Sequence, residues 1–153
     1  MRVISTLLYP VLFLSVTVYA DFHIWSRIQR SLCLAENCED IVVDDLVACP
    51  WSNQGCGCWG TGSSAARIEN WDELELPPSG VFRVPTGFCG QTKPLDFYRV
   101  ADGSWVFYTE GGEGGIKGTC VNDSDKDVET CPTGFLTTAT AKKELWCQTP
   151  ICA

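Results

Sequence analysis

Cysteine thiols are the side chains in this 153-residue sequence with the widest chemistry, because they can attack substrates, hold metal ions or pair as disulfides. The chain has ten of them. An even number allows every thiol to pair, and an oxidising compartment favours pairing. We therefore predict disulfides, which leave no thiol for nucleophilic catalysis or for zinc. The ten residues are Cys33, Cys38, Cys49, Cys56, Cys58, Cys89, Cys120, Cys131, Cys147 and Cys152.

The spacing of two cysteines restricts the connectivity of these bridges. Cys56 and Cys58 are separated by one residue, and a bridge between them would be strained. We expect the two to bond to different partners. Because a bridge typically stabilises a fold by ~2–4 kcal/mol, a chain with several of them tolerates long irregular loops.

Other catalytic groups are sparse. The single histidine, His23, lies near the start of the chain and we interpret it as incidental. The alternative is a small secreted hydrolase, in which Asp72, Glu73 and Glu75 next to Trp71 would supply an acid and a base beside an aromatic sugar platform. Sequence proximity does not set the separation of carboxyl groups, so we predict no catalytic residue.

The polar run 122–127 offers two further kinds of site. Its alternating oxygen side chains resemble the first half of a calcium loop, but the glycine at position six and the glutamate at position twelve are missing. A helix–loop–helix calcium site is therefore excluded, and a looser calcium site is the alternative. We predict no metal and no other cofactor. Asn122-Asp123-Ser124 matches the acceptor for N-glycosylation, which we assign to Asn122.

Six tryptophans are the strongest signal for recognition. Trp25, Trp105 and Trp146 stand in patterned segments, and we expect them in the core. The remaining three are candidate binding residues, because tryptophan is enriched among the residues that dominate protein interfaces. Two of them lie in a glycine-rich loop crowded with cysteines, where packing against disulfides is the alternative role. The three candidates are Trp51, Trp59 and Trp71.

The N-terminus has the parts of a secretory signal. Arg2 precedes an apolar run that ends near Val18, and small residues at Val18 and Ala20 match a cleavage site. We predict a signal peptide over residues 1–20 and a single secreted, extracellular domain over residues 21–153. No later apolar run is long enough to span a membrane.

The charge of the chain limits its partners. The formal net charge is −8, and removal of Arg2 with the leader makes it −9. Nucleic acids and anionic lipid surfaces require basic proteins, so both are excluded as partners. A cationic partner is compatible with this charge, and so is a solvated acidic surface.

Two elements are expected to position the loops. Apolar residues at helical spacing, including Trp25, Ile28 and Leu32, predict an amphipathic helix over residues 21–36. Residues 96–100 and 105–109 are rich in aromatic and β-branched side chains and predict a central antiparallel hairpin. A two-residue turn at Asp102-Gly103 would place Tyr98 opposite Phe107 and cover both faces of the hairpin.

The predicted fold is a small disulfide-rich, mainly β (α+β) domain with an N-terminal helix, a central hairpin and long disulfide-pinned loops. From the absence of a catalytic constellation we infer a secreted, monomeric binding protein that acts on an extracellular protein, receptor or glycan. A toxin, an effector or a defence protein would match this description. The hydrolase near Trp71 is the alternative function.

Overall fold

The computed structural model describes six segments of the chain, residues 20–31, 42–59, 64–70, 80–123, 127–132 and 137–152. The predicted signal peptide lies outside the described residues except for Ala20. Cys33, Cys38 and Trp71 also lie outside them.

The described residues form β-strands and two short 3₁₀ helices, with no α-helix among them. The strands are β1 (Ala20–Ser31), β2 (Val42–Pro50), β3 (Ala66–Arg67), β4 (Phe82–Val84), β5 (Leu95–Arg99), β6 (Trp105–Thr109), β7 (Gly118–Asn122), β8 (Val128–Pro132) and β9 (Thr137–Thr149). The 3₁₀ helices are η1 (Gly55–Trp59) and η2 (Phe88–Gly90). No helix in this part of the chain is long and apolar enough to cross a membrane.

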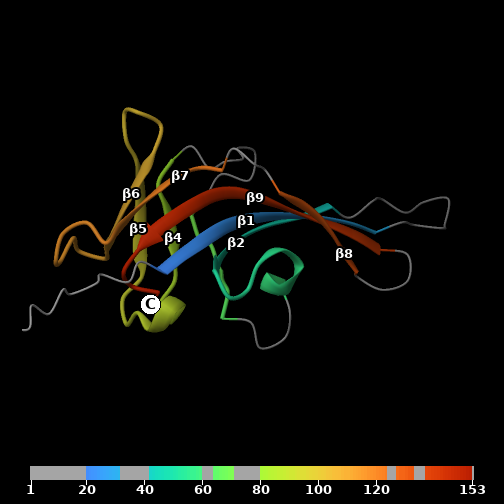
Figure 1. Ribbon diagram of the computed structural model, residues 1–153, viewed down its shortest axis with the longest axis horizontal. Helices are drawn as coiled ribbons and strands as arrows, with labels where there is room; N and C mark the ends of the chain where they lie inside the picture. The colour runs from blue at the N-terminus through green and yellow to red at the C-terminus, as the bar shows by residue number, and fades with distance from the viewer. Residues whose placement is uncertain are drawn as a thin grey trace, which may run out of the picture.

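All strands belong to one antiparallel sheet that curls into a nearly closed barrel. The strand order is β3-β2-β1-β9-β7-β6-β5-β4, and β8 pairs with the N-terminal half of β9. The two edges meet at a single bridge, in which Glu69 and Arg83 exchange backbone hydrogen bonds of 2.8 and 2.9 Å. In Figure 1, β1 and β9 run side by side along the molecule, with β4 to β7 at one end and β8 at the other.

The inside of the barrel is filled by aromatic and aliphatic side chains. Phe97 stacks between Phe82 and Phe107, with ring centroids 4.5 and 4.6 Å apart. Phe22 from β1 meets Phe97 and Phe107 edge-on. All four rings are completely buried. Side chains that point inward from alternate positions therefore form the core, as in other small barrels.

The predicted helix over residues 21–36 is wrong, because the described part of that range belongs to β1. Phe22 and Ile24 face the barrel core, whereas His23 and Trp25 point outward and are buried by other parts of the chain. A strand buried on both faces lacks the usual alternation of apolar and polar residues. Its apolar residues then match helical spacing by coincidence, and the fold is all-β rather than α+β.

The predicted hairpin is present as β5 and β6, but its predicted register is wrong by one residue. Phe97 pairs with Phe107, and Tyr98 pairs with Val106. The turn contains three residues instead of two. Gly103 donates a backbone hydrogen bond to Val100 and has a φ of 86°, as in a type I turn followed by a glycine bulge. The prediction of two covered faces also fails, because the outward Tyr98 is 43% exposed.

Because β7 packs closely against β6 and β9, we predict that a side chain at Gly118 destabilises the fold. A Cβ atom there would lie within 2.4 Å of both the Phe107 ring and the backbone oxygen of Gln148. We expect Gly118→Ala to lower the free energy of unfolding by about 1–3 kcal/mol, the usual cost of overpacking. Urea unfolding of the disulfide-intact protein measures the change.

Gly80→Ala is the matched control, because nothing lies within 4 Å of its Cβ position. Its free energy of unfolding should change by no more than about 0.5 kcal/mol. Equal effects of the two variants would contradict the packing described for β7.

Candidate functional site

The loop after β2 is held to the sheet by two disulfides. Cys58 bonds to Cys49 at the end of β2, and Cys56 bonds to Cys131 on β8. The neighbouring cysteines thus have different partners, as their spacing predicted. The sulfurs pack in an outer cluster that covers the outward face of the long strands. It comprises Trp25, Val47, Cys49, Cys58, Cys131, Ala139 and Ala141.

Two further bridges hold the barrel itself. Cys120 and Cys147 are directly opposed on β7 and β9, and their bridge lies in the barrel core. Cys89 in η2 bonds to Cys152 just after β9. Every cysteine among the described residues is therefore bonded.

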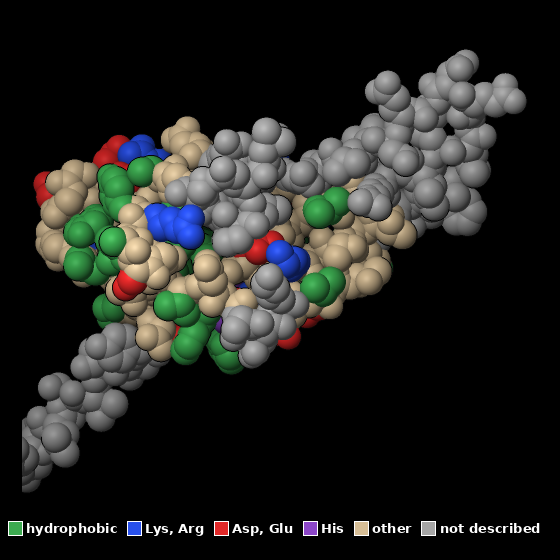
Figure 2. Space-filling model, turned by 90° about the horizontal axis from the view of Figure 1, so that it is seen from above, with side chains coloured by type: hydrophobic (Ala, Val, Ile, Leu, Met, Phe, Trp, Pro, Cys, Tyr) green, Lys and Arg blue, Asp and Glu red, His purple; other side chains and the backbone are tan. Residues whose placement is uncertain are grey.

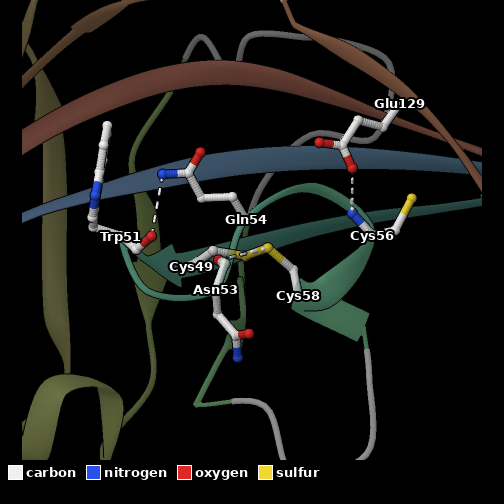
Figure 3. Close-up of a disulfide and its surroundings, with 7 residues drawn as sticks. All are labelled: Cys49, Trp51, Asn53, Gln54, Cys56, Cys58 and Glu129. Carbon is white, nitrogen blue, oxygen red and sulfur yellow. Dashed lines mark hydrogen bonds between the residues drawn. A yellow bond between two sulfur atoms is a disulfide. The ribbon is translucent and has the colours of Figure 1, made fainter.

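Hydrogen bonds fix the backbone of the loop in addition to the disulfides. The backbone amide of Trp51 donates to the carbonyl oxygen of Asp21 over 3.1 Å. Gln54 Nε2 donates to the carbonyl oxygen of Trp51, and the amide of Cys56 donates to Glu129 Oε2 over 3.0 Å (Figure 3). Gly55 has a φ of 54° and lies directly under the Glu129 carboxylate, where a Cβ atom would collide with it.

The Trp51 side chain is exposed although its backbone is held. It stands on the side of the loop opposite Cys56 and Glu129 (Figure 3), and 61% of its surface is accessible. Its ring centroid lies 5.3 Å from that of His23. A large apolar side chain is thus presented to solvent from a rigid backbone.

Trp51 borders a hollow of about 380 Å³ on the outside of the barrel. Its floor is a row of outward side chains on three adjacent strands. His23 on β1 lies opposite Trp146 on β9, and Trp146 lies opposite Val121 on β7. We call this site the Trp51 hollow. Its lining residues are Asp21, His23, Trp51, Val121, Asn122, Asp123, Lys143 and Trp146.

Lys143 carries the only positive charge among these lining residues, and it forms ion pairs with two carboxylates. Its Nζ lies 3.1 Å from Asp123 Oδ2 and 2.8 Å from Asp127 Oδ2. Burial alone would lower the pKa of Lys143, but hydrogen bonds to Asp127 and Asp123 outweigh it and raise the pKa. Both belong to the run 122–127 that the sequence offered for a looser calcium site, whose third aspartate, Asp125, lies outside the described residues. Here they hold an ammonium group, and the described residues contain no metal-ligating cluster.

His23 is the most deeply buried titratable group of the hollow. It is 2% exposed, and its Nδ1 has no hydrogen-bond partner. Burial lowers the pKa of His23 from its ordinary value of 6.5, and the nearby Lys143 ammonium lowers it further. Asp123, Asp21 and Asp127 oppose this shift without cancelling it. The imidazole is therefore neutral at pH 7.

The structure separates the three predicted binding residues. Trp59 is half-buried against the outer cluster, and the Arg27 guanidinium lies 5.3 Å above its ring. Arg27 in turn forms an ion pair of 2.9 Å with the buried Asp45. Trp51 lines the hollow instead, and Trp71 lies outside the described residues together with Asp72, Glu73 and Glu75 of the hydrolase alternative.

Asn122 lies at the end of β7 and is exposed. It lines the Trp51 hollow, while Ser124 of the same acceptor sequence lies outside the described residues. Glycosylation of Asn122 stays a prediction.

Sequence reasoning singled out Trp51, Asn122 and Asp123 for a site and missed the other lining residues, Asp21, His23, Val121, Lys143 and Trp146. His23 was interpreted as incidental, and Trp146 was expected in the core, where only Trp25 and Trp105 are fully buried. Trp146 is half-buried and faces outward. Alternation along β1 and β9 turns both side chains to the outer face, and only the register of the two strands places His23 opposite Trp146.

A second hollow, of about 310 Å³, lies over the outer face of β5 and β6. Tyr98 and Tyr108 meet there edge-on with centroids 5.9 Å apart. The nearly buried Asp96 accepts two hydrogen bonds from Arg83, of 2.7 and 3.1 Å. In Figure 2, hydrophobic side chains gather at this end of the molecule with acidic and basic side chains among them. This hollow has no unmatched charge among its described lining residues.

Comparisons of the chain with protein-family models, curated proteins and solved structures found no match.

The environment of His23 predicts a pH-dependent stability. Because its pKa is lower in the fold than the value of 6.5 in the unfolded chain, the unfolded state binds more protons between the two values. The contribution of His23 to the free energy of unfolding is complete above about pH 6.5 and declines as the pH falls toward the folded pKa. Urea unfolding at about pH 7.5 and about pH 5.5 measures the loss.

His23→Gln is the control, because glutamine is polar and does not titrate. The loss of stability between these two pH values should be smaller in the variant than in the parent. The same loss in both proteins would show that His23 does not titrate as its burial requires.

Proposed function

We propose that this chain is a secreted, disulfide-stabilised binding protein that recognises an extracellular protein, receptor or glycan through the surface around Trp51. The exposed tryptophan on a fixed backbone is the observation that carries the proposal. Tryptophan dominates many interfaces because it buries a large apolar area while ordering few torsions.

Secretion is supported by the leader and by the bridges. The apolar segment that ends at Ala20 has the form of a signal peptide. Four disulfides link the described residues, and stable disulfides are typical of proteins that leave the cell. A toxin, an effector and a defence protein all use such a frame.

Rigidity of the loop supports recognition rather than a purely structural role. Two bridges and the hydrogen bonds from Trp51 and Cys56 hold the loop backbone before any partner arrives. Binding then costs less conformational entropy, which raises affinity for a given contact area. The Trp59 ring, half-buried beside Arg27, is assigned as a secondary contact at the edge of the same loop. Trp71 is retained as a candidate contact.

The hydrolase near Trp71 is not proposed as a second function. Its carboxylates lie outside the described residues, so no observed geometry brings an acid and a base together.

Trp51→Ala tests the proposal. The immobilised, disulfide-intact parent and variant are each exposed to extracellular proteins and glycans, and the affinity for each captured partner is measured. We expect binding to weaken at least tenfold, or about 1.4 kcal/mol, because a central tryptophan contact is lost. The free energy of unfolding should change by less than about 0.5 kcal/mol, since the side chain is exposed.

Tyr98→Ala is the matched control, because it removes an exposed aromatic ring from the second hollow. Partner binding should be unchanged in this variant. If Tyr98→Ala weakens binding and Trp51→Ala does not, the recognition surface lies over β5 and β6 and the proposal is wrong.

Trp59→Ala tests whether the Trp59 ring is a secondary contact with the partner. The proposal requires weaker binding with a nearly unchanged free energy of unfolding. Loss of folding would instead show that Trp59 serves only to pack against the outer cluster.

A further inference from the structure

The Trp51 hollow has an excess of negative charge. Asp21, Asp123 and Asp127 carry three carboxylates on or next to it, and Lys143 supplies one ammonium group. The buried His23 adds no charge at neutral pH. Cleavage after Ala20 would leave an α-amino group on Asp21, and the carboxylates would still outnumber the positive groups.

The carboxylates are not equally engaged. Asp123 and Asp127 both contact the Lys143 ammonium. Asp21, at the start of β1, forms no ion pair with any described residue. The Asp21 carboxylate therefore stands beside Trp51 without a lysine or arginine partner among the described residues, and the backbone amide of Trp51 is bonded to the carbonyl oxygen of the same Asp21.

Aromatic rings supply the rest of the wall. Trp51 projects over the hollow and Trp146 lies in its floor. The face of an indole ring carries partial negative charge and attracts cations, most strongly where water is displaced. Aromatic rings and carboxylates in one hollow favour the same kind of ligand, an organic cation. Both groups stabilise its positive charge, and the rings also contact its apolar substituents.

We propose that the Trp51 hollow binds an organic ammonium group, supplied either by a lysine side chain of a partner protein or by a small free organic ammonium compound. This inference rests on the proposed function and names the chemistry of its partner. The ammonium group lies between the Trp51 ring and the Asp21 carboxylate, and its alkyl part contacts Val121 and Trp146. The net charge, −8 for the full sequence and −9 without the predicted leader, attracts such partners from a distance.

An anion does not suit the hollow. The only lysine or arginine among the described lining residues, Lys143, is already bonded to two carboxylates. A phosphate or carboxylate ligand would meet Asp21 without a compensating cation. The second hollow offers no comparable site for a cation, because Asp96 there is already bonded to Arg83.

A pair of probes of the same shape isolates the effect of charge. Choline and 3,3-dimethylbutan-1-ol differ in the replacement of a quaternary nitrogen by carbon. Each is titrated at constant ionic strength into the disulfide-intact secreted protein, and the indole N–H resonances of Trp51 and Trp146 are followed by NMR. We expect choline to bind at least about fivefold more tightly than the alcohol. Equal affinities would overturn the inference.

Variants identify the groups responsible. Trp51→Ala should weaken choline binding about fivefold or more, as expected for the loss of a cation–π contact. Asp21→Asn should weaken it about threefold or more and leave the alcohol unaffected, because only the cation senses the lost charge. Glu113→Gln is the matched control, since it removes one exposed carboxylate that is paired with Lys93 away from the hollow. An equal effect of Asp21→Asn and Glu113→Gln would show only a general response to net charge.

A peptide distinguishes the two sources of the ammonium group. An acetylated, amidated glycine–lysine–glycine peptide is compared with its norleucine counterpart. Tighter binding of the lysine peptide than of choline would assign the hollow to a partner side chain, and the reverse order would assign it to a small free organic ammonium compound. If neither cation binds while Trp51-dependent capture of a macromolecule persists, this inference fails and the proposed function stands.

Discussion

The antiparallel pairing of β1 with β9 is the contact on which the rest of the structure depends. It joins strands near the two ends of the described chain over their whole length, with one irregularity between Ile24 and Trp25. On one face these strands contribute Phe22, Ile24 and Leu145 to the barrel core. Their other face supports the outer cluster and the floor of the Trp51 hollow. Loss of this pairing would remove the core and the candidate site together.

Burial of both faces of β1 requires a second layer, which the disulfide-held loop provides. The bridge between Cys49 and Cys58 returns the chain onto the outer face directly after β2 ends, and the bridge from Cys56 ties the loop to β8. The sulfur atoms then pack with Trp25, Val47, Ala139 and Ala141 on this face. A short chain with limited apolar area gains stability from such bridges. The same bridges hold the Trp51 backbone while its side chain faces solvent.

Some features of the fold could be read from residue types alone. The separate partners of Cys56 and Cys58 follow from the geometry of a disulfide, and the strands around Asp102-Gly103 follow from local preference. The register of that hairpin does not, because a three-residue turn with Gly103 at positive φ suits the same residues as a two-residue turn. Trp51 and Trp59 were equivalent in sequence, yet one lies on an open hollow and the other against Arg27.

The amino-acid sequence by itself determined the chemical limits of this protein: thiols that can pair, a negative net charge, an N-terminal apolar segment of the form of a signal peptide, and tryptophans in a cysteine-rich loop. Only the tertiary structure decided that residues 20–31 form a strand, because β2 and β9 satisfy its backbone hydrogen bonds and two separate clusters cover its faces. It also decided which side chains form the hollow. His23, Trp146 and Val121 are far apart in the chain and become neighbours through strand register, which is a long-range property that no local pattern encodes.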